Sequence, residues 1–108
     1  MKILLVLPHG PIHRAVSGSY KRSLRYAPLT LATLVALIPS ELQAEVRVID
    51  EGAESWDPRS YLDVDLVGIS SMTGTARRGY ALADFFRQNR VPVIIGGIHA
   101  TLMPHEAK

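Results

Sequence analysis

The chain is short, nearly neutral and free of cysteine, and these totals exclude several classes of function. Its 108 residues fit one domain, and a hydrophobic content of 47% is enough for a core. Twelve Lys and Arg against ten Asp and Glu give a formal net charge of +2, which does not favour nucleic-acid binding. The absence of cysteine excludes disulfides, a thiolate nucleophile and a cysteine-held iron–sulfur or zinc site within these residues.

The first predicted element is a strand over residues 3–7. These residues are continuously apolar, which is typical of a strand covered on both faces in a parallel sheet, so we expect a central position. The N-terminus superficially resembles a secretion signal, but its apolar stretch ends at Pro8 and no small-residue cleavage site follows. No run approaches the roughly 18 apolar residues of a membrane span. We therefore expect a cytoplasmic protein.

A long loop and a helix follow this strand. Residues 8–27 carry no sustained hydrophobic period, and loops of that length in compact domains are usually functional or disordered. A helix is predicted to begin at Pro28, a residue suited to the first turn, and to end before Pro39, which forbids its continuation. Its apolar surface is wide enough to pack on a sheet.

The second half of the chain predicts three further strands and one long helix. The strand over 46–49 is interrupted by Arg47, which favours an edge position, and residues 55–61 predict a short helix or turn. A buried strand is predicted over 66–69 and a fourth strand over 93–95. Between them the spacing predicts a helix over 76–88, whose apolar face contains Gly79, Leu82, Ala83 and Phe86.

This order of elements predicts a flavodoxin-like or Rossmann-like doubly wound α/β fold with a parallel sheet, in one domain over residues 1–108. In the flavodoxin-like order 2-1-3-4, ligands bind outside the carboxyl ends of the strands, near the switch point between the first and third. The fourth strand is fully apolar and would form an exposed edge, which invites pairing. We therefore expect a fifth strand with its helix beyond the given residues; the alternative is an edge-strand dimer.

Three loops at this predicted rim supply the candidate site. Glycine lets a backbone approach a bulky ligand closely and adopt positive φ, although an ordinary tight turn has the same need. The hydroxyl groups can hydrogen-bond a ligand, and one of the hydroxyls among Ser70, Ser71, Thr73 and Thr75 is expected to cap the next helix. The candidates are Pro8, His9 and Gly10 after the first strand, Ser70, Ser71, Met72 and Thr73 after the third, and Gly96, Gly97 and His99 after the fourth.

Charged residues near the loops allow more than one interpretation. Arg77 and Arg78 sit in the first turn of a predicted helix, where the macrodipole disfavours cations unless an anion such as a nucleotide phosphate lies nearby; the alternative is a solvated surface. His9 and His13 follow the first strand in a loop, so their spacing does not make them a helical metal pair. His99 is expected to cap the glycine loop rather than to bind metal. No pair of carboxylates stands among the three loops, which disfavours acid–base catalysis.

Several runs together resemble the N-terminal cobalamin-binding domain of cobalamin-dependent radical SAM enzymes. The resemblance covers nearly the whole chain. It is carried by DLVGISSMT (65–73), ARRGYALA (76–83), IGGIHAT (95–101) and PHEA (104–107), and by the opening segments 2–8, YAPLTLATL (26–34) and VRVIDE (46–51).

The resemblance implies a cobalamin (vitamin B12) cofactor in this domain. It implies that Gly96 and Gly97 border the slot for the nucleotide tail and that Ser70 and Met72 line it. It further implies a C-terminal radical SAM domain in the same protein, absent here, in which three cysteines hold a [4Fe–4S] cluster that works with SAM. The parent enzyme would then transfer a methyl group or carry out a radical cyclisation or rearrangement, and residues 1–108 alone would catalyse nothing.

The sequence departs from one familiar cobalamin pattern. The string Asp-x-His-x-x-Gly after the first strand is absent. The lower axial position of the cobalt is therefore open between no protein ligand, His9 and His13.

Two other functions are compatible with the fold. A cobalamin-free scaffold could dock on the same catalytic half through Arg14, Arg22 and Arg25. An FMN site is suggested by residues 71–75, which resemble the flavodoxin phosphate loop, but that loop follows the first strand in flavodoxins and the third strand here. A signalling receiver is disfavoured because residues 8–10 replace its acidic pair.

Overall fold

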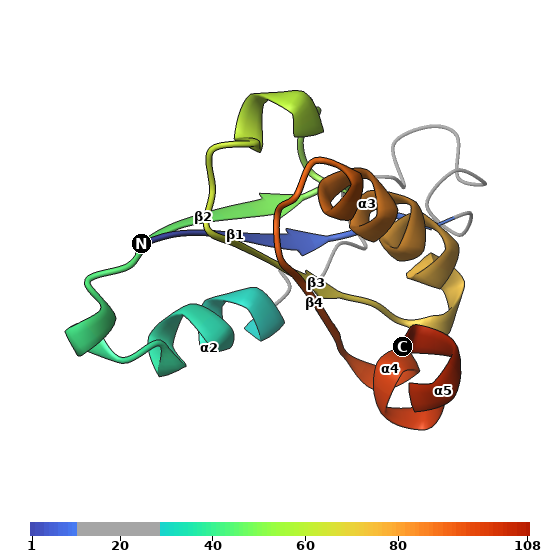
Figure 1. Ribbon diagram of the computed structural model, residues 1–108. Coiled ribbons are helices and arrows are strands. Elements are labelled where there is room, and N and C mark those ends of the chain that lie inside the picture. The colour runs from blue at the N-terminus through green and yellow to red at the C-terminus, as the bar shows by residue number, and fades with distance from the viewer. Residues whose placement is uncertain (11–28) are drawn as a thin grey trace.

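A four-stranded parallel sheet forms the centre of the molecule. The computed structural model describes residues 1–10 and 29–108. The strands lie in the order β2-β1-β3-β4, all parallel (Figure 1). This confirms the predicted α/β class, the central first strand and the edge position of the second. The strands are β1 (Lys2–Leu7), β2 (Glu45–Asp50), β3 (Leu66–Ser70) and β4 (Val93–Gly96).

Two long helices cover opposite faces of this sheet. Figure 1 shows α2 (Leu29–Leu37) on one side and α3 (Ala76–Gln88) on the other. The helix predicted over 76–88 is confirmed, and the turn predicted over 55–61 is a short helix, Pro58–Tyr61. The other short helices are Ser40–Leu42, Thr73–Thr75, α4 (Ile98–Leu102) and α5 (Pro104–Ala107).

Some predictions concern residues outside the described part of the chain. These are the loop over residues 11–27, the helix start at Pro28, and the roles suggested for His13, Arg14, Arg22 and Arg25. Within the described residues, no helix is both long and apolar enough to cross a membrane.

The α3 side of the sheet holds the larger core. Strand residues at every second position point toward this helix and are buried with Leu82, Ala83 and Phe86. Gly79 lets α3 approach closely, since a Cβ there would overlap the Ser71 side chain. Trp56 extends the layer by stacking on Phe86, with ring centroids 6.5 Å apart.

The α2 side is covered unevenly. Leu31 is the only fully buried residue of α2, and it packs with Ile3 and Leu5 of the central strand. The rest of this helix is also largely apolar, yet Leu29 and Leu37 are exposed. Over β4 the same side lacks cover within the described residues, because the Ile94 side chain is 59% exposed. A helix that is apolar all round is normally buried, so this side differs from an ordinary finished surface.

Candidate functional site

The structure brings the three candidate loops together at one rim of the sheet. Because all four strands are parallel, the loops that follow them leave from the same edge. The backbone N–H of Ser71 donates to the Gly96 carbonyl oxygen at 2.9 Å, and the N–H of His99 donates to the Ser71 carbonyl at 3.2 Å. Gly10 lies so close to Gly74 that a Cβ at position 10 would overlap its carbonyl group. The loops therefore contact one another directly.

The two adjacent glycines have different surroundings. Gly97 has a φ of +94°, and a Cβ there would lie 2.6 Å from the Ser71 carbonyl oxygen. Position 97 therefore requires glycine, both because of the positive φ and because the Ser71 backbone lies so close. A Cβ on Gly96 would meet nothing within 4 Å. Of the pair, only Gly96 has room for a side chain, although the backbone of Gly97 is itself exposed.

The serines that end the third strand face opposite sides of the sheet. Ser71 is buried on the α3 side beside Gly79, and its Oγ has no hydrogen-bond partner among the described residues. Ser70 is half-buried and pairs in register with Gly96. By strand alternation Ser70, Ile94 and Gly96 lie on the α2 side, and we call these three residues the open β3–β4 surface.

The remaining candidates of the third loop are divided between solvent and a polar cluster. Met72 is exposed, whereas Thr73 Oγ1 lies 3.2 Å from Nδ1 of His99. Nε2 of His99 lies 3.0 Å from the hydroxyl of Tyr80 and 3.2 Å from a carboxylate oxygen of Glu106. Both nitrogens of this buried ring are therefore engaged. The prediction that His99 caps the glycine loop is wrong for the ring, although its backbone N–H does tie that loop to Ser71.

The expected serine or threonine cap of α3 is also absent. The residue at the cap position is Thr75, and its side chain makes no capping hydrogen bond to the helix. Its hydroxyl instead accepts from the N–H of Met72 at 3.0 Å. The reason is that a single helical turn, Thr73–Thr75, precedes α3, so the chain enters the helix without the extended residue that a side-chain cap requires.

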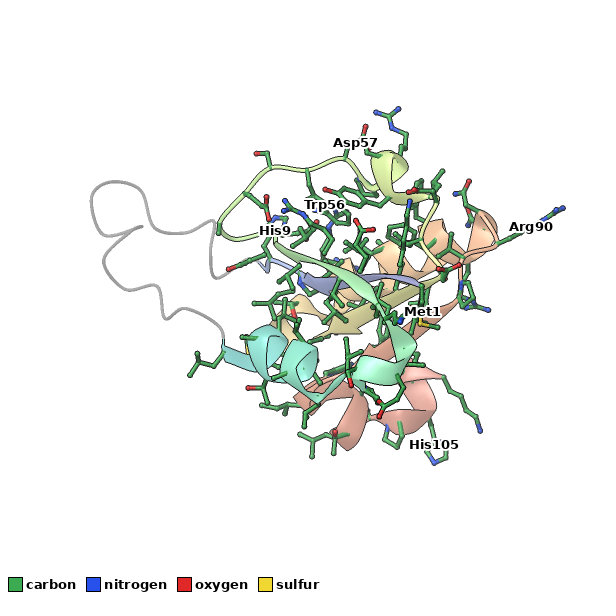
Figure 2. The ribbon with its side chains drawn as sticks, turned by 90° about the vertical axis from the view of Figure 1, so that its left-hand side faces the viewer. Met1, His9, Trp56, Asp57, Arg90 and His105 are labelled. Carbon is green, nitrogen blue, oxygen red and sulfur yellow. The ribbon has the colours of Figure 1, made fainter. Side chains whose placement is uncertain are left out.

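A buried carboxylate at the end of the second strand is the part of the rim that the sequence reasoning missed. Glu51 is 4% exposed at its side chain. It accepts hydrogen bonds from Arg78 Nη2 at 2.6 Å, from Trp56 Nε1 at 2.9 Å and from the His9 backbone N–H at 3.2 Å. Figure 2 shows His9 and Trp56 close together at one end of the molecule, far from Arg90.

This cluster corrects the interpretation of Arg78. Its anion is neither a bound phosphate nor solvent but Glu51, while Arg77 is exposed. Burial alone would raise the pKa of Glu51, but hydrogen bonds from Arg78, Trp56 and His9 outweigh it and lower the pKa to about 2. The hydrogen bond to Glu51 also raises the pKa of Arg78. Glu51 is therefore ionised at neutral pH and holds the rim together rather than exchanging protons.

One feature of the sequence indicates Glu51 as a candidate residue of the rim. Glu51 comes directly after a strand whose carboxyl end lies at the ligand-binding rim of a doubly wound sheet. That position alone does not distinguish Glu51 from the polar end of a strand, because a single acidic residue before a glycine is typical of a turn.

The described residues contain no cluster that could bind a free metal ion. Among residues 1–10 and 29–108, no three His, Asp or Glu side chains come close enough together for such a site.

Two curated methyltransferases of Chlorobaculum tepidum are similar to this chain. The bacteriochlorophyllide d C-8(2)-methyltransferase is 38% identical over 80 residues, which are 73% of this chain and 17% of that enzyme. The bacteriochlorophyllide d C-12(1)-methyltransferase is 32% identical over 80 residues, 74% of this chain and 17% of that enzyme. No family model and no solved structure matches. The chain spans about a sixth of the length of these curated relatives and is similar to one segment of each.

Proposed function

We propose that the chain is the cobalamin-binding region of a radical SAM methyltransferase. The two similar enzymes support the methyltransferase part by their names. The family resemblance of the sequence supports the cofactor. The observation that carries the proposal is the open space beside Gly96, at a rim where doubly wound sheets bind their ligands.

The residues at this rim fit a large flat cofactor with a tail. Ser70 and Gly96 would receive the tail on the open β3–β4 surface, where a side chain at position 96 would occupy the space. Residues 8–10 and Met72 would contact the ring. Ser71, Gly97 and the His99 cluster would act indirectly, because they are engaged in contacts that fix the loops.

The cofactor supplies the methyl-carrying chemistry, and the chain supplies its position. Glu51 at the rim is already ionised and shared among three hydrogen-bond donors. It is therefore unsuited to general acid–base work, which requires a pKa near the working pH. This agrees with a region that binds and orients rather than one that catalyses.

The rest of the reaction is assigned to a partner domain of the same protein. We propose a C-terminal radical SAM domain that holds SAM and a [4Fe–4S] cluster. The two relatives are named for different positions, C-8(2) and C-12(1), yet each matches over 80 residues. We infer that the choice of substrate position lies outside this segment, and that a tetrapyrrole of the chlorophyllide type is the first substrate class to test.

One observation favours a second candidate, a cobalamin-free scaffold. Leu29, Leu34 and Leu37 of α2 are exposed, and such side chains suit a surface that docks against another domain. In that case the open β3–β4 surface would be part of the docking face.

The test is to add hydroxocobalamin to the 1–108 chain and to the full-length encoded protein, remove free cofactor, and record the spectrum of the bound corrin. We expect one cobalamin per full-length chain. Gly96→Val should abolish binding by filling the open space, whereas Ala81→Val, a similar change at an exposed position of α3, should leave binding intact. Circular dichroism of both variants verifies their folding. Binding by neither protein would favour the scaffold, and unimpaired binding by Gly96→Val would place the cofactor elsewhere.

A further inference from the structure

A groove lies between the first turns of α3 and the short helices α4 and α5 (Figure 1). Its volume of about 620 Å³ is within the range of pockets that bind small molecules. None of the three residues of the open β3–β4 surface lines it. The groove is therefore distinct from the space beside Gly96.

The walls of the groove are joined to one another by the buried ring of His99. Its Nδ1 lies 3.2 Å from the hydroxyl oxygen of Thr73, and its Nε2 lies 3.0 Å from the hydroxyl oxygen of Tyr80. Nε2 also lies 3.2 Å from Oε1 of Glu106 in α5. These contacts hold α4 and α5 against α3, so the groove exists before any ligand enters, as is usual for small-molecule sites.

Two opposite charges line this groove without pairing with each other. Arg77 is exposed and has no ion-pair partner among residues 1–10 and 29–108. An arginine in the first turn of a helix is disfavoured by the macrodipole unless an anion lies nearby. Glu106 is half-exposed, and its Oε1 is engaged by Tyr80 and His99, whereas Oε2 has no hydrogen-bond partner in the same part of the chain. Among the described residues, the groove thus offers one unpaired cation and one unpaired carboxylate oxygen.

Apolar side chains form much of the remaining lining. Leu102 and Met103 are 68% and 48% exposed, and both line the groove together with Ala76. Apolar side chains beside a few convergent polar groups are typical of a small-molecule site. A ligand for this groove should therefore combine an apolar part with both a negative and a positive charge.

We propose that the groove binds a free α-amino acid with an apolar side chain. The carboxylate of the ligand accepts hydrogen bonds from the Arg77 guanidinium, and its ammonium group donates to Oε2 of Glu106. Its side chain lies on Leu102 and Met103. A simple anion fits less well, because the Glu106 carboxylate repels it. The site goes beyond the proposed function, since none of these four residues is assigned to cobalamin.

The ligand class is tested by titrating the 1–108 chain with L-leucine, without any cofactor, and following the amide signals by ¹H–¹⁵N NMR. A ligand of this size reaches a Kd of about 1 mM, so the titration extends to about 50 mM. Signals of residues 73–80 and 98–107 should shift and saturate. N-acetyl-L-leucine, L-leucine amide and glycine each lack one of the three recognised groups and should bind at least about 10-fold more weakly.

Charge variants test the two polar contacts. Arg77→Gln and Glu106→Gln should each weaken L-leucine binding about 10-fold or more. Glutamine at position 106 keeps an oxygen that can accept from Tyr80, so the wall of the groove is retained. Arg87→Gln, at an exposed arginine near the other end of α3, should leave the affinity unchanged. Unchanged affinity in both charge variants would place the ligand elsewhere and overturn the proposal.

A second pair of variants tests the apolar contact. Leu102→Ser should weaken L-leucine binding, whereas Leu37→Ser, at a similarly exposed leucine of α2, should not. Circular dichroism verifies the folding of every variant. Equal affinities of these two variants would contradict the apolar part of the site.

Three further results of the titrations would overturn the proposal. The absence of saturable shifts with L-leucine means that the groove binds no amino acid. Equal binding of N-acetyl-L-leucine means that the site recognises an anion alone. Equal binding of N-acetyl-L-leucine amide, which resembles a residue within a peptide, assigns the groove to a protein partner. None of these results bears on cobalamin binding, because no cofactor is present.

Discussion

The two sides of the sheet are built very differently. On the α3 side, Phe86 and Leu82 are fully buried, and a network around Glu51 closes the rim. On the α2 side, a uniformly apolar helix buries only Leu31 fully and leaves Ile94 exposed across the sheet. The first side is a finished core, whereas on the second several apolar and small residues lack cover within the described residues 1–10 and 29–108.

We propose that the packed α3 side serves stability and that the open α2 side serves binding. A packed core has no room for a ligand, because protein interiors are as dense as organic crystals. Ser70 and Gly96 lie on the open side, and Ser71 and Gly79 on the closed side, although they are neighbours in the sequence or in space. Substitutions on the two sides should therefore affect different properties.

The largest difference in stability is expected between alanine substitutions at Phe86 and at Leu34. Phe86→Ala removes a fully buried ring and should lower the free energy of unfolding by about 3–5 kcal/mol. Leu34→Ala, on the exposed surface of α2, should change it by less than about 0.5 kcal/mol. Urea unfolding of the two variants measures both values. Equal losses would show that the α2 side is as tightly packed as the other.

A pH dependence should arise from the closed side. The pKa of Glu51 is lowered to about 2 in the folded chain, from 4.5 in the unfolded one. Its contribution is therefore complete above the unfolded value and is lost as the pH falls toward 2. Between pH 6 and pH 2 the unmodified chain should lose roughly 3 kcal/mol more stability than Glu51→Gln. The comparison uses denaturant unfolding at several pH values.

Glu54→Gln is the control for that pH series. The side chain of Glu54 is about ten times as exposed as that of Glu51, at 40% against 4%, and its partner is a surface arginine. Exposed pairs contribute at most about 1 kcal/mol. The free energy of unfolding of Glu54→Gln should thus fall with pH as that of the unmodified chain does. A smaller loss of stability at low pH in this variant would show that Glu54, and not Glu51, causes the acid sensitivity.

The adjacent glycines allow a sharper comparison within one loop. Gly97→Ala forces a Cβ against the Ser71 backbone at positive φ and should cost about 1–3 kcal/mol or more. Gly96→Ala places its Cβ in open space and should leave stability nearly unchanged while weakening cobalamin binding. Thermal unfolding of the two variants measures their stability, and titration with cobalamin measures their binding. A stable Gly97→Ala would contradict the close packing of the two loops.

The smallest effect is expected at Ile94. Ile94→Thr replaces an exposed apolar side chain by a β-branched one that suits a strand, so the stability of the 1–108 chain should change by less than about 0.5 kcal/mol. In a longer protein with the proposed C-terminal domain, the same change should weaken whatever packs on the open β3–β4 surface. A large loss in the short chain would mean that this surface is already covered.

The fold could be predicted largely from local patterns. Residues 3–7 and 66–69 are apolar runs, and the period of residues 76–88 is helical, so β1, β3 and α3 were expected with boundaries correct to about one residue. The site was predictable only as far as topology allowed, because loops after parallel strands meet at one rim. The individual roles of the candidate residues stay predictions.

What the sequence by itself determined is the order of the elements and the rim at which the candidate loops meet, because both follow from hydrophobic period and from parallel topology. Only the tertiary structure decided the surroundings of each residue. Gly96 and Gly97 are the same residue type at adjacent positions, but a Cβ on Gly96 would face open space, whereas a Cβ on Gly97 would meet the backbone of Ser71. Glu51 and Arg78 are separated by 27 residues and become partners because β2 ends and α3 begins at the same corner. Side-chain burial and pairing depend on contacts between distant segments, which no local pattern encodes.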